Sequence, residues 1–193
     1  MSKNKILVTG GAGFIGSILA PQLLEKGHFV RVVDNLMHNQ FGLSACFLND
    51  NFEFWKGDIR DEKLIASALE GIDYIIHLAA IVGEPACQKD PALCSSINLG
   101  GTEMINRLRS PNQKMVFAST GGVYGRVDGI CTENSPLNPI VSHYSISKRE
   151  AEKLIVDKGD YVIYRFATGF GLSPRTKLDL LINDFVWQAL KNK

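Results

Sequence analysis

The sequence predicts an α/β protein built on a doubly wound parallel sheet of about six strands, with helices on both faces. Two observations predict this fold. Short, nearly continuous apolar segments alternate with longer segments of helical periodicity along the 193 residues. In addition, the first apolar segment leads directly into a glycine-rich turn and then a helix, an order that opens many doubly wound sheets.

The expected strands are short runs of apolar residues, as suits strands that are buried on both faces of a sheet. They cover residues 5–8, 29–33, 52–56, 74–78, 114–118 and 161–165. Helical segments separate most of these runs, so the strands are expected to be parallel.

The expected helices carry apolar residues at helical spacing. They cover residues 14–26, 61–69, 95–108, 143–156 and 178–190. In the first of them Ile15, Ile18, Leu19 and Leu23 share one face, and in the second Asp61 is a suitable N-cap. Residues 121–142 form a long loop rich in glycine and proline, and a loop of this length in a compact domain is usually functional.

Composition and charge exclude several classes of protein. The chain is 45% hydrophobic and 21% charged, unlike a disordered or collagen-like chain. Its 21 Lys and Arg balance 20 Asp and Glu at a net charge of +1, so we expect neither nucleic acid nor a membrane as a partner. No apolar run approaches the roughly 18 residues of a membrane span, and the N-terminal run is too short for a signal peptide. A cytoplasmic protein is expected.

The four cysteines are Cys46, Cys87, Cys94 and Cys131, and no two of them form a CxxC pair. This spacing argues against a zinc site, and no metal is expected. A chain of this size does not need a disulfide framework, so we expect reduced thiols.

The first strand ends in a glycine pattern formed by Gly10, Gly13 and Gly16, and Gly11 completes a second version of it. Glycine permits a tight turn there, close approach of the backbone to a diphosphate, and close packing of helix on strand. The free N–H groups and positive dipole end of the following helix attract the anion. A simple glycine-rich turn is the alternative, but the strand before and the helix after favour nucleotide binding.

Acidic residues follow the second and third strands. Asp34 comes 18 residues after Gly16, where a carboxylate can accept hydrogen bonds from ribose hydroxyls and would repel a 2′-phosphate. This favours NAD over NADP, although Asp34 could instead only cap a turn. Asp58 could accept a hydrogen bond from the adenine amino group, although such a residue is more often an N-cap, a role for which Asp61 is better placed.

Tyr144 and Lys148 form a YxxxK pair at the start of a predicted helix, one turn apart on one face. A lysine ammonium beside a phenol is expected to lower the pKa of the phenol from about 10 towards neutrality. Tyr144 could then act as general base towards an alcohol. Ser119 and Thr120 end the fifth strand, and a hydroxyl there could bridge the substrate and the tyrosine, or could only form a turn.

Together these residues resemble the extended short-chain dehydrogenase/reductases, the NAD-dependent epimerase/dehydratase family. The resemblance rests on residues 9–16, 34–36, 57–61, 77–80, 98, 101–102, 119–120, 123–125, 144, 148 and 164–166. It implies a Rossmann-type sheet with strand order 3-2-1-4-5-6, tightly held NAD, a Ser/Thr–Tyr–Lys catalytic group and, most often, a nucleotide-sugar substrate.

The resemblance also implies roles for individual residues. The catalytic residues would be Thr120, Tyr144 and Lys148. The cofactor would be bound by Gly10, Gly13, Phe14, Ile15, Gly16, Asp34, Asn35, Asp58, Ile59, Leu78, Ala79, Ala80, Asn98, Tyr144 and Lys148. The substrate would be bound by Val82, Thr120, Tyr144 and Thr168.

The chain departs from the family pattern at two places in the site. Dehydratases of the family commonly carry Asp-Glu after the catalytic threonine, whereas Gly121 and Gly122 stand here. Glu84 and Asp128 are expected in solvated loops rather than as replacements, which favours an epimerase over a 4,6-dehydratase. Thr168 stands where the family often has a substrate-binding asparagine.

The third departure is length, because family members usually run to about 300 residues. We therefore expect a NAD-binding domain at 1–171 and the start of a truncated substrate lobe at 172–193. The helix at 178–190 carries more apolar surface than a free terminal helix should, so we expect it to need a partner.

The favoured function is a nucleotide-sugar epimerase that transiently oxidises a sugar hydroxyl. One alternative is a reductase or dehydrogenase of another small carbonyl compound, and another is a truncated NAD-binding protein without catalysis. A homodimer through the helices 95–108 and 143–156 is expected from the family.

Overall fold

The computed structural model describes residues 3–39 and 42–192. In these residues one parallel sheet of six strands has the predicted order β3-β2-β1-β4-β5-β6. The strands are β1 (Lys5–Thr9), β2 (Phe29–Asp34), β3 (Phe52–Lys56), β4 (Tyr74–His77), β5 (Lys114–Thr120) and β6 (Tyr161–Phe166). Every predicted strand is present, with ends that differ by at most two residues.

The helices are α1 (Gly16–Glu25), α2 (Glu62–Ala68), α3 (Glu84–Lys89), α4 (Pro91–Ser95), α5 (Gly101–Leu108), α6 (His143–Lys158) and α7 (Leu181–Lys191). Shorter helical segments are the 3-10 turns η1 (Ser44–Leu48) and η3 (Gly121–Tyr124) and the π turn η2 (Ser96–Gly100). As predicted, Asp61 caps α2 by accepting hydrogen bonds from the N–H groups of Lys63 and Leu64.

Several predicted helix ends are wrong. The first helix begins at Gly16, not at residue 14; residues 14–15 form a turn before it, and Ile15 is its N-cap. The helix expected from residue 95 is the end of a longer helical run that begins at Pro91, where Asp90 accepts a hydrogen bond from the N–H of Leu93. Helix α6 continues to Lys158, and α7 begins at Leu181. Helix α3 was not predicted.

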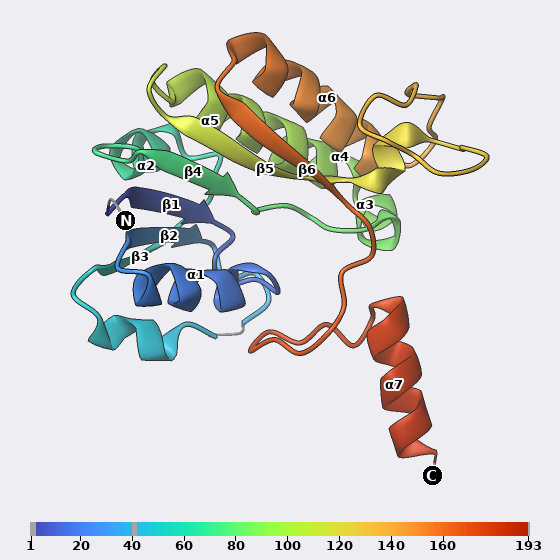
Figure 1. Ribbon diagram of the computed structural model, residues 1–193, viewed down its shortest axis with the longest axis horizontal. Helices are drawn as coiled ribbons and strands as arrows, with labels where there is room; N and C mark the ends of the chain where they lie inside the picture. The colour runs from blue at the N-terminus through green and yellow to red at the C-terminus, as the bar shows by residue number, and fades with distance from the viewer. Residues whose placement is uncertain (1–2, 40–41, 193) are drawn as a thin grey trace.

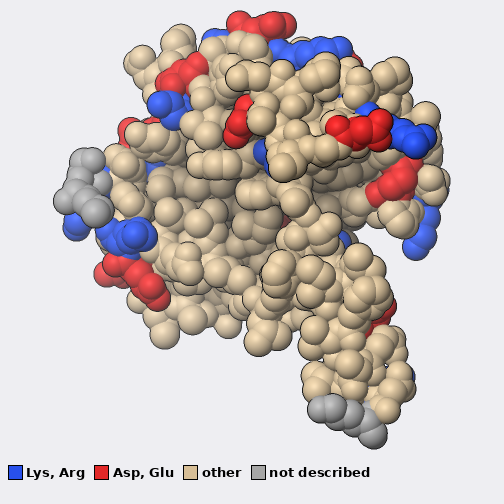
Figure 2. Space-filling view, turned by 45° about the vertical axis from the view of Figure 1, so that its right-hand side comes forward, with Lys and Arg blue, Asp and Glu red and all other residues tan. Residues whose placement is uncertain are grey.

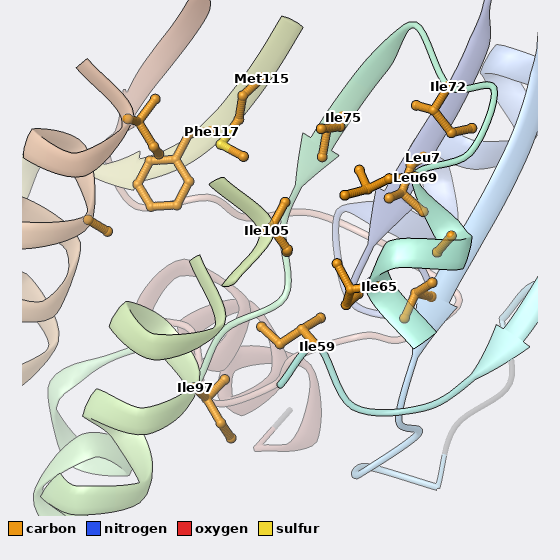
Figure 3. Packing of buried hydrophobic residues seen from close by; sticks show 14 residues of the cluster. Leu7, Ile59, Ile65, Leu69, Ile72, Ile75, Ile97, Ile105, Met115 and Phe117 are labelled. Atoms are coloured by element: carbon orange, nitrogen blue, oxygen red, sulfur yellow. The ribbon is translucent and has the colours of Figure 1, made fainter. Parts of the chain in front are cut away.

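Helices α2, α5 and α6 cover one face of the sheet, and α1 with η1 covers the other face beneath β1, β2 and β3 (Figure 1). Each face of the sheet has its own core, and alternate residues of β1 point to different cores. Leu7 lies in the first core, under α2, α5 and α6, whereas Ile6 and Val8 lie in the second core, against α1 and η1. In the first core, Ile75 of β4 and Phe117 of β5 lie around Ile105 of α5 (Figure 3). Because all six strands are parallel, their carboxyl ends lie at one edge of the sheet.

The face opposite α6 stays uncovered over β6, where Val162, Tyr164 and Phe166 are exposed to 37%, 52% and 44%. Helix α7 extends away from the sheet (Figure 1) and has no buried residue; Phe185 on it is 64% exposed. The apolar face that the sequence shows on this helix is therefore not packed against the rest of the described chain.

The prediction of four reduced thiols is wrong for two of them. Cys87 on α3 and Cys94 on α4 form a disulfide, whereas Cys46 and Cys131 are free. The two short helices bring the cysteines together, with 5.1 Å between their Cα atoms. Because α3 had not been predicted, the spacing of seven residues gave no indication of this pairing.

Charged side chains of both signs are interspersed in small groups on the face that Figure 2 shows. Within residues 3–39 and 42–192, no helix is long and apolar enough to cross a membrane. No group of three or more His, Cys, Asp or Glu in the same residues could hold a metal ion.

Candidate active site

The glycine-rich turn joins β1 to α1 at the carboxyl edge of the sheet. Gly10 has a φ of +69°, and a Cβ there would lie 2.6 Å from the backbone nitrogen of Ala79. A Cβ on Gly16 would lie 2.4 Å from the Cα of Gly11. Both positions therefore require glycine. Helix α1 then begins at Gly16 without a side-chain cap and without an acidic residue in its first turn, so its positive dipole end can attract an anion.

Asp34 ends β2 beside this turn. Its Oδ2 accepts a hydrogen bond from the N–H of Ala12 at 3.0 Å, and its Oδ1 accepts one from the N–H of Leu36 at 2.8 Å. Each oxygen keeps a further lone pair. Asp34 lines a small pocket together with Ala12, Gly13, Leu36, His38 and Arg175. Asn35 is exposed, and its side chain accepts a hydrogen bond from the N–H of Met37.

The side chains of the segment after β3 mainly contact other parts of the protein. The Asp58 carboxylate pairs with the Arg60 guanidinium at 2.7 Å, and this hydrogen bond lowers the pKa of Asp58. Arg60 also donates to Ser96 Oγ, so this pair links the loop to η2. Ile59 is 5% exposed and its side chain belongs to the core.

The end of β4 is fixed by a buried polar network. The His77 ring is hydrogen-bonded to the Thr9 hydroxyl through Nδ1 at 2.6 Å and to the Thr102 hydroxyl through Nε2 at 2.9 Å. Burial, assisted by the charge of Lys148, lowers the pKa of His77 to about 3, so the ring is neutral near pH 7. Leu78, Ala79 and Ala80 follow at the edge of the sheet.

Asn98 on η2 is 1% exposed, and its amide group is occupied by protein atoms. Its Oδ1 accepts from the N–H of Ile81 at 2.8 Å, and its Nδ2 donates to the Ile81 carbonyl at 3.0 Å and to Ser147 Oγ at 3.3 Å. Asn98 therefore ties the segment after β4 to α6.

Tyr144 and Lys148 lie one turn apart on α6, as predicted. The predicted fall in the pKa of Tyr144 is wrong for this structure, because burial raises it to about 12. Burial also lowers the pKa of Lys148 to about 7, although the charge of Glu152 opposes this shift. Lys148 Nζ lies 4.6 Å from the ring centroid of Phe117. Desolvation disfavours both charged forms and outweighs the expected attraction between them.

The two hydroxyls at the end of β5 differ in what they contact. Ser119 is 3% exposed and donates a hydrogen bond to the Glu152 carboxylate, which also pairs with Arg165 at 2.8 Å. Thr120 is only partly buried and accepts a hydrogen bond from the N–H of Gly122 at 3.2 Å. The Ser119 hydroxyl is committed to the interior, so Thr120 is the hydroxyl better placed for a substrate.

Gly122 leaves no open space beside Thr120. A Cβ on Gly122 would lie 2.4 Å from Ser145 Oγ, so α6 packs directly against η3 there. At Gly121 a Cβ would lie 3.6 Å from the Phe166 carbonyl oxygen, an ordinary contact. The remaining residues predicted to bind substrate, Val82 and Thr168, are both exposed.

Glu84 is not in a solvated loop, contrary to the prediction. Its carboxylate accepts hydrogen bonds from the Ser142 hydroxyl and from the N–H of Tyr144, the latter at 3.1 Å. These hydrogen bonds, chiefly that from Ser142, lower the pKa of Glu84. Asp128 is exposed, as expected.

The segment after β6 returns to the glycine-rich turn, which the sequence did not indicate. Ser173 Oγ donates to the Phe14 carbonyl at 2.8 Å and lies 3.0 Å from Ser17 Oγ. Arg175 lines the Asp34 pocket, and its Nε is buried without a hydrogen-bond partner in the described chain. These contacts join positions about 160 residues apart, so no local pattern predicts them.

A sequence model of the NAD dependent epimerase/dehydratase family matches residues 6–193. A Bacillus subtilis protein named an uncharacterized UDP-glucose epimerase, YtcB, is 37% identical over 98% of this chain and 63% of its own length. The UDP-glucuronic acid 4-epimerase of Bacillus cereus, solved with UDP-glucuronic acid and NAD, is 30% identical with a TM-score of 0.84, over 98% of this chain and 64% of that one. The dTDP-glucose 4,6-dehydratase of Bacillus anthracis, solved with NAD, is 28% identical with a TM-score of 0.83, over 98% of this chain and 62% of that one. This chain thus spans slightly less than two thirds of these proteins.

Proposed function

Because this chain belongs to the NAD-dependent epimerase/dehydratase family, we propose that it acts as a nucleotide-sugar 4-epimerase that uses NAD. The observation that carries the proposal is the shared edge of the sheet. The glycine-rich turn after β1, Asp34 at the end of β2 and Thr120 at the end of β5 all lie at the carboxyl ends of parallel strands. Ligands of doubly wound sheets bind at this edge.

The residues present fit NAD. Gly10 brings the turn against the backbone of Ala79, and the uncapped start of α1 suits a diphosphate. The Asp34 carboxylate, already held by two backbone N–H groups, has lone pairs left for the ribose hydroxyls of the adenosine half. Its charge disfavours a 2′-phosphate, so we propose NAD rather than NADP. In this proposal residues 1–171 bind the cofactor and 172–193 belong to the substrate-binding part.

When bound, NAD supplies a hydride acceptor. Tyr144 would take the proton of the sugar hydroxyl as the hydride leaves the same carbon, and would return a proton when the ketone is reduced from its other face. Lys148 would stabilise the tyrosinate, and Thr120 would hold the sugar oxygen. Since burial raises the pKa of Tyr144 to about 12 without ligands, this role requires positive charge near the phenol in the working complex.

The chain resembles solved dehydratases as well as epimerases, but its residues favour epimerisation. Elimination of water across C5 and C6 of a 4-keto sugar needs an acid and a base near those carbons. Gly121 and Gly122 supply neither, and Glu84 is engaged by α6. We therefore propose that the chain has no 4,6-dehydratase activity.

NAD and nucleotide sugars are intracellular metabolites, so we place the protein in the cytoplasm. We also propose a homodimer through the helices at 95–108 and 143–156, because α6 exposes Ile146 and Val156 to 40% and 45%. Light scattering that shows a monomer at high micromolar concentration would contradict the dimer.

The function is tested by incubating the protein with NAD and UDP-glucose or UDP-glucuronic acid. The expected products are the C4 epimers, formed without net accumulation of NADH. Steady release of NADH would identify a dehydrogenase instead, and a 4-keto-6-deoxy sugar would identify a dehydratase.

A further inference from the structure

The Glu84 carboxylate connects the segment after β4 to the first turn of α6. One carboxylate oxygen, Oε2, accepts from both the Ser142 hydroxyl and the N–H of Tyr144. Ser142 is the N-cap of α6, and its Oγ also accepts a hydrogen bond from the N–H of Ser145 at 3.1 Å. N–H groups in the first turn of a helix lack partners within the helix, so these side chains satisfy them.

The carbonyl of Tyr144 is held as well. Ser147 Oγ donates to it at 2.8 Å, and Asn98 Nδ2 donates to Ser147 Oγ at 3.3 Å. Asn98 in turn binds both backbone groups of Ile81. The N–H and the carbonyl of Tyr144 are therefore both fixed by side chains that lead back to residues 81–84.

We propose that Glu84 is a positioning residue that fixes the backbone of Tyr144, and with it the phenol, relative to the carboxyl ends of β4 and β5. The inference rests on the proposed function of Tyr144 as the proton acceptor. Glu84 reaches the reaction only through Tyr144 and Ser142.

Two properties separate this role from ordinary helix capping. The contact falls on the backbone of the proposed base itself, one turn before Lys148. It also joins α6 to a segment that carries Val82, a residue proposed to face the substrate. Asp61 gives a control, because its carboxylate also accepts hydrogen bonds from N–H groups in the first turn of a helix, but α2 carries no proposed catalytic residue.

The test compares Glu84→Ala, Glu84→Gln and the control Asp61→Ala with the wild-type protein. Calorimetry measures the affinity for NAD, and steady-state kinetics with UDP-glucose give kcat and KM. Thermal unfolding measures the stability of each variant. For Glu84→Ala we expect unchanged NAD affinity and KM and a kcat lowered at least about tenfold, because small displacements of a reacting group are costly. Glu84→Gln should recover part of kcat, since its amide oxygen can still accept a hydrogen bond. Asp61→Ala should lower thermal stability and leave kcat unchanged.

A second measurement does not depend on turnover. The ring resonances of Tyr144 in the NAD complex, identified by their loss in Tyr144→Phe, should move in Glu84→Ala and stay in place in Asp61→Ala. Unchanged resonances together with a kcat within about twofold of wild type would overturn the proposal, as would equal losses of kcat in Glu84→Ala and Asp61→Ala. A wild-type protein that binds NAD but forms no epimer would refute the proposed function, and the resonances would then decide the role of Glu84 by themselves.

Discussion

Tyr144 and Lys148 lie one turn apart on α6, yet burial raises the pKa of the tyrosine to about 12 and lowers that of the lysine to about 7. The sequence shows the spacing of the two residues but not the surroundings that remove water from them. The same limit applies to Ser119 and Thr120: both are hydroxyls at the end of one strand, and the family resemblance selects Thr120, but only the structure shows that the Ser119 hydroxyl is taken up by Glu152.

Replacing Tyr144 by Phe should remove nearly all epimerisation while NAD affinity stays close to that of the wild type. The substitution removes only the phenolic hydroxyl, and general acid–base steps contribute about 10²–10⁴-fold. Turnover and calorimetric NAD titrations check this. A variant that keeps more than about a tenth of the activity would show that another group is the base.

Replacing Asp34 by Ala should weaken NAD binding by at least about tenfold, because hydrogen bonds to a charged acceptor are lost. NADP binding should weaken less or improve, since repulsion of the 2′-phosphate is removed as well. Calorimetric dissociation constants for both cofactors test this expectation. Tighter binding of NADP than of NAD by the wild-type protein would refute the role of Asp34.

The buried Lys148 should make stability depend on pH. Its pKa falls from 10.5 to about 7 on folding, so between these values the unfolded chain binds more protons than the folded chain. Stability should therefore rise as the pH increases through this range. Replacing Lys148 by Met should flatten the rise, measured as the difference in unfolding temperature between about pH 7 and pH 9. Equal differences in the two proteins would contradict the assignment.

At the scale of elements, local patterns predicted most of the fold. The six strands were predictable because each is a short apolar run. The Asp61 cap was predictable because Asp61 directly precedes the helix that it caps. The start of α1 and the α3–α4 pair were missed. Ile15 has helical φ and ψ but precedes α1 as its N-cap, so periodicity does not separate it from the helix. Helices α3 and α4 are too short to show helical periodicity.

The Cys87–Cys94 disulfide ties α3, which carries Glu84, to α4. Reduction of this disulfide, which closes a short loop, should lower the free energy of unfolding by about 2 kcal/mol. Before reduction, a thiol reagent should label only the exposed Cys131 in the folded protein, because Cys46 is buried. Mass spectrometry counts the labels, and unfolding with and without reductant gives the stability. Labelling of Cys87 or Cys94 in the folded, unreduced protein would contradict the disulfide.

At the scale of the whole molecule, the residues proposed to bind the cofactor and to act in catalysis share one edge of the sheet, while α7 and the outer face of β6 keep apolar surface exposed. The first arrangement was predictable, because parallel strands place their carboxyl ends together. The return of Ser173 and Arg175 to the glycine-rich turn was not, because it depends on the path of the chain after β6.

The central claim is that a sugar carbon is transiently oxidised at this edge and then reduced. It is tested most directly with UDP-glucose that carries deuterium at C4, incubated with the protein and NAD. A hydride that passes to NAD and returns to the same carbon keeps the label, so we predict UDP-galactose that retains deuterium at C4. Loss of the deuterium to water, or no conversion by a protein that binds NAD, would contradict the account.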